Sequence, residues 1–272
     1  MCWMKGCDDR REMGEELDDE REILKQVFGD SSEDEDCEDQ TVIGDSAYEG
    51  GHIRRWEQAK EIRGLWLCRS FLSPQQESSL LAAIRNEGWF MEASQNQAMR
   101  FGNLPTWAAE LSDSIHEAVL SSNHMTDPLI VDRHNGVKID CPLPSDILWR
   151  EPLFDQMIAN MYQPGEGICA HVDLMRFEDG IAIVSLESPC VMHFTRVDET
   201  SCDPTSKGEV DVSMSKVPIY LNPGSVVLLW GEARYLWKHE INRKPGFQMW
   251  EGQELTQGRR TSITLRKLCQ VD

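Results

Sequence analysis

The stretch Tyr162-Gln-Pro-Gly-Glu-Gly-Ile-Cys-Ala-His171-Val-Asp173 places a His-x-Asp pair just after a glycine-rich turn. An apolar run over 181–186 follows it. In a β-strand successive side chains alternate between faces, so His171 and Asp173 are predicted to point the same way. An imidazole beside a carboxylate provides two of the three ligands of a facial metal site, and the third must come from elsewhere in the chain.

Short apolar segments precede and follow this stretch. They are separated by residues typical of turns, such as Pro164-Gly165 and Asn222-Pro-Gly224. Many short strands in series predict a double-stranded β-helix, or jelly roll, over 147–270. The candidate strands are 157–162, 171–173, 181–186, 191–196, 217–221, 225–230, 234–241 and 261–268.

Upstream, residues 51–146 are predicted to supply helices that pack on one side of the jelly roll, which makes the fold class α+β. Ser73-Pro-Gln-Gln76 has the N-cap serine, first-turn proline and glutamine that begin a helix. A second amphipathic helix is expected over 107–119. Residues 52–63 are predicted to form a basic helical segment, and 65–68 a strand.

Charge is distributed unevenly along the chain. The net charge is −20, and residues 1–50 carry 18 acidic and 5 basic side chains, which leaves −7 for the remainder. An acidic segment poor in large apolar residues is predicted to be a disordered tail, which could dock a basic partner. Since the remainder is not basic, binding of a nucleic acid would require a local patch of lysine and arginine side chains. Candidates are Arg54, Arg55, Lys60, Arg63, Arg100 and Arg133.

The nine cysteines are odd in number and contain no Cys-x-x-Cys pair, which favours free thiols in a reducing compartment. No apolar run approaches the roughly 20 residues of a membrane span. The first residues lack the apolar region of a signal peptide. We therefore expect a soluble protein of the cytoplasm, the nucleus or both, without a membrane partner.

His239 is the best candidate for the third metal ligand. It lies in Trp237-Lys-His239, on a predicted strand that follows the apolar run 225–230. His193 is on a predicted strand but has no ligand-like neighbour. The other histidines, His52, His116, His124 and His134, lie upstream of the strand-rich region.

The last strand, Arg260-Thr-Ser-Ile-Thr-Leu-Arg266, has a polar face. By alternation Arg260 and Arg266 share that face with Ser262 and Thr264. Two guanidinium groups on a strand that lines a barrel call for an anion, because guanidinium forks pair with carboxylates. The alternative is an ordinary solvent-facing strand with surface arginines.

Asn160 and Tyr162 also stand two apart on one predicted strand, and they could offer an amide and a phenol to the same anion. Alternatively, they are a strand-end asparagine and a half-buried tyrosine. A metal with three protein ligands beside a carboxylate pocket leaves room for a chelating 2-oxo acid and for O2. This is the arrangement of a non-haem Fe(II) oxygenase.

These motifs resemble the AlkB family of Fe(II)/2-oxoglutarate dioxygenases. The family patterns Asn-x-Tyr, His-x-Asp, a distant His and Arg-x-x-x-x-x-Arg occur here in order. The resemblance implies Fe(II), 2-oxoglutarate and O2 as cofactors. It implies His171, Asp173 and His239 as iron ligands, and Arg260 as partner of the distal carboxylate of 2-oxoglutarate. Arg266, Asn160 and Tyr162 would hold the rest of this cosubstrate.

Within the family, residues 231–239 and 177–186 are most similar to the branch that hydroxylates a modified wobble uridine in tRNA. This resemblance implies hydroxylation or demethylation of a modified nucleobase in RNA, tRNA included, or in DNA, with RNA and tRNA favoured over DNA. The segment Gln97-Ala-Met-Arg-Phe101-Gly corresponds to the family's substrate lid, so Arg100 and Phe101 become substrate candidates. For Phe101, packing in the core is the alternative.

Two other functions fit the same residues. A protein-directed oxygenase of this fold would tolerate the acidic surface better and would bind a basic partner. A non-catalytic adaptor would dock through residues 1–50 and retain the metal site as a relic, which the intact ligands and both arginines argue against.

Overall fold

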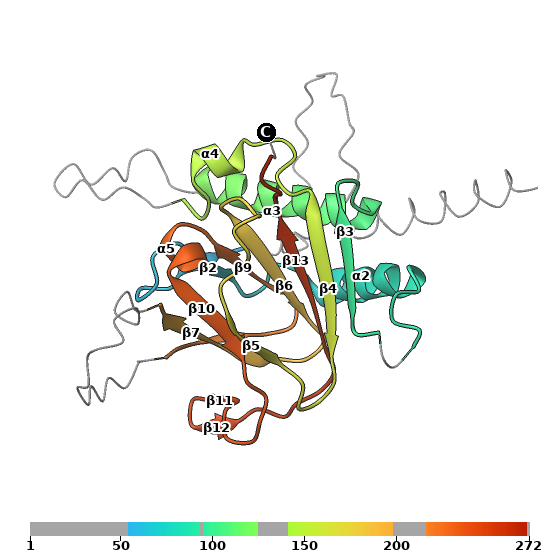
Figure 1. Ribbon diagram of the computed structural model, residues 1–272, viewed down its shortest axis with the longest axis vertical. Coiled ribbons are helices and arrows are strands. Elements are labelled where there is room, and N and C mark those ends of the chain that lie inside the picture. Colours follow the sequence, from blue (N-terminus) through green and yellow to red (C-terminus); the bar gives the residue numbers. More distant parts are fainter. Residues whose placement is uncertain (1–53, 93–94, 125–140, 198–215, 271–272) are drawn as a thin grey trace, which may run out of the picture.

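The computed structural model describes residues 54–92, 95–124, 141–197 and 216–270, which form two antiparallel sheets with helices on one side (Figure 1). The tail 1–50 and Arg133 lie outside these residues. The elements are β1 (Trp56–Gln58), β2 (Leu65–Cys68), α2 (Pro74–Asn86), β3 (Gln97–Phe101), α3 (Thr106–His124), α4 (Ser145–Leu148), β4 (Gln156–Tyr162), β5 (Ile168–His171), β6 (Ile181–Leu186), β7 (Cys190–Arg196), β8 (Val217–Leu221), β9 (Ser225–Leu229), α5 (Glu232–Tyr235), β10 (Trp237–Ile241), β11 (Met249–Trp250), β12 (Gln253–Glu254) and β13 (Arg260–Arg266).

The described strands assemble mainly into two sheets. The larger has seven strands in the order β1-β2-β9-β6-β13-β4-β3, and the smaller has four in the order β5-β10-β7-β8. The last strand, β13, lies between β6 and β4, so the C-terminal residues pair with segments about 80 to 100 positions earlier in the chain. The predicted jelly roll with helices on one side is confirmed.

Both faces of the larger sheet are covered. On β6, Ile181 and Ile183 face the smaller sheet and belong to the core between the sheets. Ala182 and Val184 alternate with them and belong to a second core on the helix side. Burial on both faces explains why β6 and the neighbouring β9 are nearly continuous apolar runs without polar alternation.

The helices α2 and α3 pack on the outer face of the larger sheet (Figure 1). Ser73 begins α2 with the predicted capping box, in which its hydroxyl accepts from the Gln76 amide while the Gln76 side chain accepts from the Ser73 amide. The α3 residues Leu111 and Ile115 are fully buried against the sheet. No described helix is both long enough and apolar enough to cross a membrane.

The structure corrects several predicted elements. Residues 54–63 form β1 and turns rather than a helix. The predicted strand 171–173 is wrong at its end, because β5 stops at His171 and Asp173 follows it in a loop. The predicted strand 234–241 begins as the short helix α5, and only 237–241 are extended. The edge strand β3 was not predicted, because its residues are half exposed and show no apolar period.

Candidate active site

Three side chains from separate segments meet between the two sheets. His171 ends β5 and is the register partner of His239 on β10, so the two imidazoles lie side by side with ring centroids 4.3 Å apart. Asp173 comes from the loop after β5, and its Oδ2 lies 3.7 Å from Nε2 of His239. One ligand atom from each residue lies within 4.8 Å of the others. The predicted His-Asp-His cluster is therefore assembled, in a geometry that fits a metal ion.

The hydrogen bond of His171 and the burial of His239 both suit metal binding. Nδ1 of His171 lies 2.8 Å from the Cys169 carbonyl oxygen. With a proton on Nδ1 donated to that carbonyl, Nε2 keeps its lone pair for a metal. Burial of His239, and then the neighbouring His171, lower the pKa of His239 to about 4. His239 is therefore neutral at pH 7 and can act as a ligand without first losing a proton.

Arg266 holds the carboxylate of Asp173. Its Nε lies 3.0 Å from Oδ1, while the other carboxylate oxygen is the one nearest to His239. Both side chains are largely buried, so the pair is weakly screened by water. An arginine predicted to bind a cosubstrate thus also contacts a predicted metal ligand.

The polar face of β13 lines the same cavity as the His-Asp-His cluster, a space of about 70 Å³. Arg260, Ser262, Thr264 and Arg266 all border it. Ile263 and Leu265 alternate with them and belong to the core under the helices. The predicted alternation is confirmed. The solvent-facing alternative is wrong, since Arg260 is only 1 % exposed.

Arg260 is a buried cation with a free donor. Its Nε donates to Oγ of Ser185 at 3.1 Å, whereas its Nη2 is buried without a hydrogen-bond partner. A buried guanidinium nitrogen left unpaired is costly, and a carboxylate would satisfy it. The Tyr162 ring lies 5.5 Å from the guanidinium carbon, and burial raises the pKa of the phenol, which stays a donor. The residues present therefore fit a dicarboxylate cosubstrate.

The edge strand β3 forms one wall of the cavity. Gln97 donates from Nε2 to Oδ1 of Asn160 at 2.8 Å and lines the cavity beside it. Gln97 was not predicted as a site residue, because one amide in a strand without apolar period gives no signal. Ser185, the partner of Arg260, was missed for the same reason, since it is a lone serine in an apolar run.

The two substrate candidates, Arg100 and Phe101, lie on opposite faces of β3. Phe101 shares the face of Gln97 by alternation, is 48 % exposed and lies 5.4 Å from the guanidinium of Arg176, so it does not pack in the core. Arg100 occupies the other face, where its guanidinium stands 4.5 Å over the ring of Trp89. The structure thus leaves Phe101 accessible and turns Arg100 toward the helical side.

The described residues of the predicted basic patch lie in two places. Arg54, Arg55, Lys60 and Arg63 adjoin β1, and Arg100 lies on β3, at the opposite edge of the larger sheet. Arg54 also donates to the Phe71 carbonyl and stacks over the Phe71 ring, which fixes it to the fold. Arg100 is therefore separated from the other four described candidates by the width of the larger sheet.

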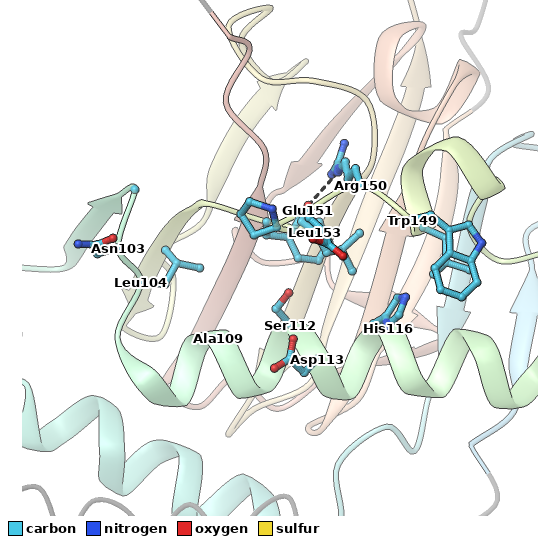
Figure 2. Close-up of a pocket in the computed structure, with 14 residues that line it drawn as sticks. Asn103, Leu104, Ala109, Ser112, Asp113, His116, Trp149, Arg150, Glu151 and Leu153 are labelled. Carbon is cyan, nitrogen blue, oxygen red and sulfur yellow. Dashed lines mark hydrogen bonds between the residues drawn. The ribbon is translucent and has the colours of Figure 1, made fainter. Parts of the chain in front are cut away.

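A larger cavity of about 610 Å³ lies elsewhere, between α3 and the segment 148–154 (Figure 2). Asp113 and His116 of α3 border it on one side, and Arg150 and Glu151 on the other. None of the residues predicted for the metal or cosubstrate site borders it. The candidate active site is therefore in the smaller of these two cavities.

Comparison with known proteins agrees with this geometry. Residues 64–266 match the model of the 2OG-Fe(II) oxygenase superfamily. The chain is 29 % identical over 229 residues to the alkylated DNA repair protein ALKBH8 homolog of Arabidopsis thaliana. It is 28 % identical over 237 residues to the tRNA (carboxymethyluridine(34)-5-O)-methyltransferase alkbh8 of Xenopus tropicalis. The resemblance to AlkB proteins is thereby confirmed.

These matches cover 76 % and 75 % of this chain, but only 59 % of the Arabidopsis protein and 32 % of the Xenopus protein. The solved structure of OsALKBH1 superimposes with a TM-score of 0.50 at 15 % identity, over 78 % of this chain and all of that one. The likeness of the structures concerns the fold alone.

Proposed function

Because the chain belongs to the 2OG-Fe(II) oxygenase superfamily, we propose that it oxidises a modified nucleobase in RNA, with tRNA favoured over DNA. One observation carries the oxygenase part of the proposal. Three ligand atoms of His171, Asp173 and His239 converge in the small cavity that Arg260 borders with a free, buried donor. The ligand atoms fit a metal ion, and the free donor of Arg260 fits an anion beside it.

In this proposal His171, Asp173 and His239 bind Fe(II) on one face. Two imidazoles and one carboxylate, without a thiolate, are the ligand set of non-haem Fe(II) oxygenases. The chemistry supplied by the bound cofactors is hydroxylation of a C–H bond, in which O2 gives one oxygen atom to the substrate carbon and one to succinate, while 2-oxoglutarate releases CO2. Where that carbon is bonded to nitrogen, the hydroxylated product breaks down to formaldehyde and the demethylated amine.

The chain's own residues orient the cosubstrate. Arg260 pairs with the distal carboxylate of 2-oxoglutarate, and the protonated phenol of Tyr162 donates to the same end. Arg266 keeps Asp173 in place and presents positive charge to the carboxylate nearest the metal. Asn160, whose Oδ1 accepts from Gln97, offers its amide hydrogens from the β4 side.

The substrate class is supported by the relatives and by the rim of the site. Two relatives are named for DNA repair and for tRNA modification. On this chain, the exposed ring of Phe101 and the guanidinium of Arg176 adjoin each other on the same edge as Gln97. Aromatic rings and guanidinium planes are the groups on which unpaired bases stack. Since the chain spans only part of these relatives, methyl transfer is not included in the proposal.

The test is succinate formation by the purified chain with Fe(II), 2-oxoglutarate and O2 in the presence of total tRNA, mRNA or single-stranded DNA. Nucleoside mass spectrometry of the same reactions identifies the oxidised base. We expect tRNA-dependent succinate from the wild type and from His193→Ala, a histidine outside the site, and none from Asp173→Ala. Equal succinate from wild type and Asp173→Ala would refute the oxygenase assignment.

A protein-directed oxygenase is the second candidate, favoured by the net charge of −20 and by the dispersed basic residues around the fold. It predicts substrate-dependent succinate with basic proteins rather than with RNA. Release of formaldehyde in either assay would distinguish demethylation from stable hydroxylation.

A further inference from the structure

Arg234 is one of the largest side chains that are fully enclosed in the described part of the chain. It lies on α5, five residues before His239, and is 2 % exposed. No carboxylate of the described residues lies within 4.0 Å of its guanidinium. A buried cation is stabilised by the hydrogen bonds that its donors make, so the bonds of Nη1 and Nη2 indicate what Arg234 does. Its Nε, which is also buried, has no partner among the described residues.

Those hydrogen bonds all go to the loop that carries Asp173. Nη1 donates to the carbonyl oxygen of Asp173 at 2.9 Å. Nη2 donates to the carbonyl oxygens of Leu174 at 2.8 Å and Phe177 at 3.3 Å. One guanidinium thus binds three carbonyl oxygens of a five-residue stretch.

The far end of this stretch is fixed by backbone pairing, because the Phe177 amide donates to the Leu174 carbonyl, the Cys269 amide donates to the Arg176 carbonyl, and Phe177 bridges Leu268. Its start at Asp173 has no such backbone hydrogen bond among the described residues. β5 ends at His171, so Asp173 has no partner in the strand ladder. The carbonyl of Asp173 is held by Arg234, while its carboxylate is held by Arg266. The rigid fork of an arginine can fix a backbone position in a way that a single-donor lysine cannot.

Arg234 also connects two ligands through the chain. α5 leads directly into β10, which carries His239. The start of α5 is attached to the same loop, because the Gly231 amide donates to both carboxylate oxygens of Asp179 at 3.0 Å. The positions of Asp173 and His239 are therefore coupled through one short helix.

We propose that Arg234 is a positioning residue, which sets the place of the Asp173 carboxylate relative to His171 and His239 and thereby the affinity of the site for its metal. The inference rests on the proposed function in that it takes these three residues as metal ligands. It assigns Arg234 no contact with the metal, with 2-oxoglutarate or with the substrate.

Arg150 provides a matched control, because it makes the same kind of bonds to the far end of the same loop. Its Nη1 and Nη2 donate to the carbonyl oxygens of Asp179 and Gly180. Its Nε donates to the carbonyl oxygen of Leu153 (Figure 2). Arg150 is thus a largely buried, carbonyl-binding arginine whose hydrogen bonds reach the loop only from Asp179 on, and its Nη1 also lies 3.7 Å from a carboxylate oxygen of Glu178. Loss of either arginine weakens the fold, but only loss of Arg234 releases the ligand.

The experiment measures Mn(II) affinity by electron paramagnetic resonance, with Mn(II) as the probe, in Arg234→Met, Arg234→Lys and the Arg150 counterparts. Urea denaturation of each variant gives its stability. We expect Arg234→Met to weaken Mn(II) binding about 10- to 100-fold, as for other residues that orient a ligand, and Arg234→Lys to weaken it about tenfold. Arg150→Met and Arg150→Lys should stay within threefold of the wild type.

Wild-type Mn(II) affinity in Arg234→Met, or an equal loss in Arg150→Met, would overturn the inference and leave the proposed function intact. If Arg234→Met does not fold, the comparison of Arg234→Lys with Arg150→Lys decides in the same way. A wild-type chain that binds no Mn(II) would instead contradict the metal site itself.

Discussion

Arg260→Met is the change that most directly probes the predicted cosubstrate pocket. Arg260 is 1 % exposed, its Nε is bound to Ser185, and its Nη2 has no hydrogen-bond partner among the described residues. A carboxylate paired with it forms one or two charge-assisted hydrogen bonds of about 1.5–3 kcal/mol each. Breaking a buried pair on one side costs about 3–5 kcal/mol. We therefore expect 2-oxoglutarate to bind roughly 100- to 4,000-fold more weakly, at about 1.4 kcal/mol per tenfold.

The assay is an anaerobic titration of the Mn(II)-loaded protein with 2-oxoglutarate, monitored by isothermal calorimetry. Arg260→Lys keeps the charge but loses the fork, and should weaken binding less than Met. The control is Arg259→Met, whose arginine is exposed and paired with Glu187, and binding there should change less than about twofold. Binding in Arg260→Met within fivefold of wild type would refute the reasoning.

The same variant also separates ligand binding from folding. Without 2-oxoglutarate, Arg260 is a buried cation with an unsatisfied donor, so its replacement by a side chain of similar length should leave the stability unchanged or raise it. A loss of more than about 2 kcal/mol in urea denaturation of the cosubstrate-free protein would mean that Arg260 has a structural role instead.

Three further outcomes are expected. A Cβ on Gly64, where φ is +85°, would lie 2.0 Å from the Trp230 carbonyl oxygen, so Gly64→Ala should lower the free energy of unfolding in urea by at least about 3 kcal/mol. At Gly102 φ is +79°, but an added Cβ would meet no described atom within 4 Å, so Gly102→Ala should lower it by only about 1 kcal/mol. Burial raises the pKa of the Cys68 thiol to about 11. Since this folded-state pKa lies above the unfolded one, the protonated thiol contributes its full share of the free energy of unfolding below pH 9, and this share is lost as the pH rises toward 11. In urea titrations, the free energy of unfolding of the wild type should therefore fall by about 1–2 kcal/mol more between pH 8 and 10.5 than that of Cys68→Ala. A parallel decline in both would contradict this. Mn(II) with 2-oxoglutarate, each at about 100 times its Kd, should raise the melting temperature of the wild type by several degrees in scanning fluorimetry, and should leave that of Asp173→Ala unchanged. An equal rise in both proteins would indicate that the ligands bind elsewhere.

Much of the fold follows from local signals that agree with one another. Ser73 and Gln76 form the capping box that their spacing predicts, and the apolar runs over 181–186 and 225–229 are strands buried on both faces. The strand β3 could not be predicted, because its residues are held by pairing with β4 rather than by an apolar period of their own. Residues 234 and 235 were predicted as extended, although Gly231 at φ +54° begins a short helix that includes them.

The candidate site divides in the same way. Strand alternation predicted correctly that Arg260 and Arg266 share a polar face. For Asp173 alternation failed, since it lies in a loop, and yet the carboxylate reaches the two histidines. Two tertiary contacts position Asp173: Arg266 contacts its carboxylate, and Arg234 donates to its carbonyl oxygen. Neither contact leaves a pattern in the sequence, because the partners are 93 and 61 positions away.

The most direct test of the metal and cosubstrate site is an anaerobic titration of the protein with Fe(II) and 2-oxoglutarate, followed by visible absorption. A 2-oxo acid chelated to Fe(II) gives a metal-to-ligand charge-transfer band that neither component gives alone. We predict that this band appears and saturates at one iron per chain in the wild type, and that it is absent in Asp173→Ala. A wild type without the band, or an Asp173→Ala variant with the same band, would contradict the assignment.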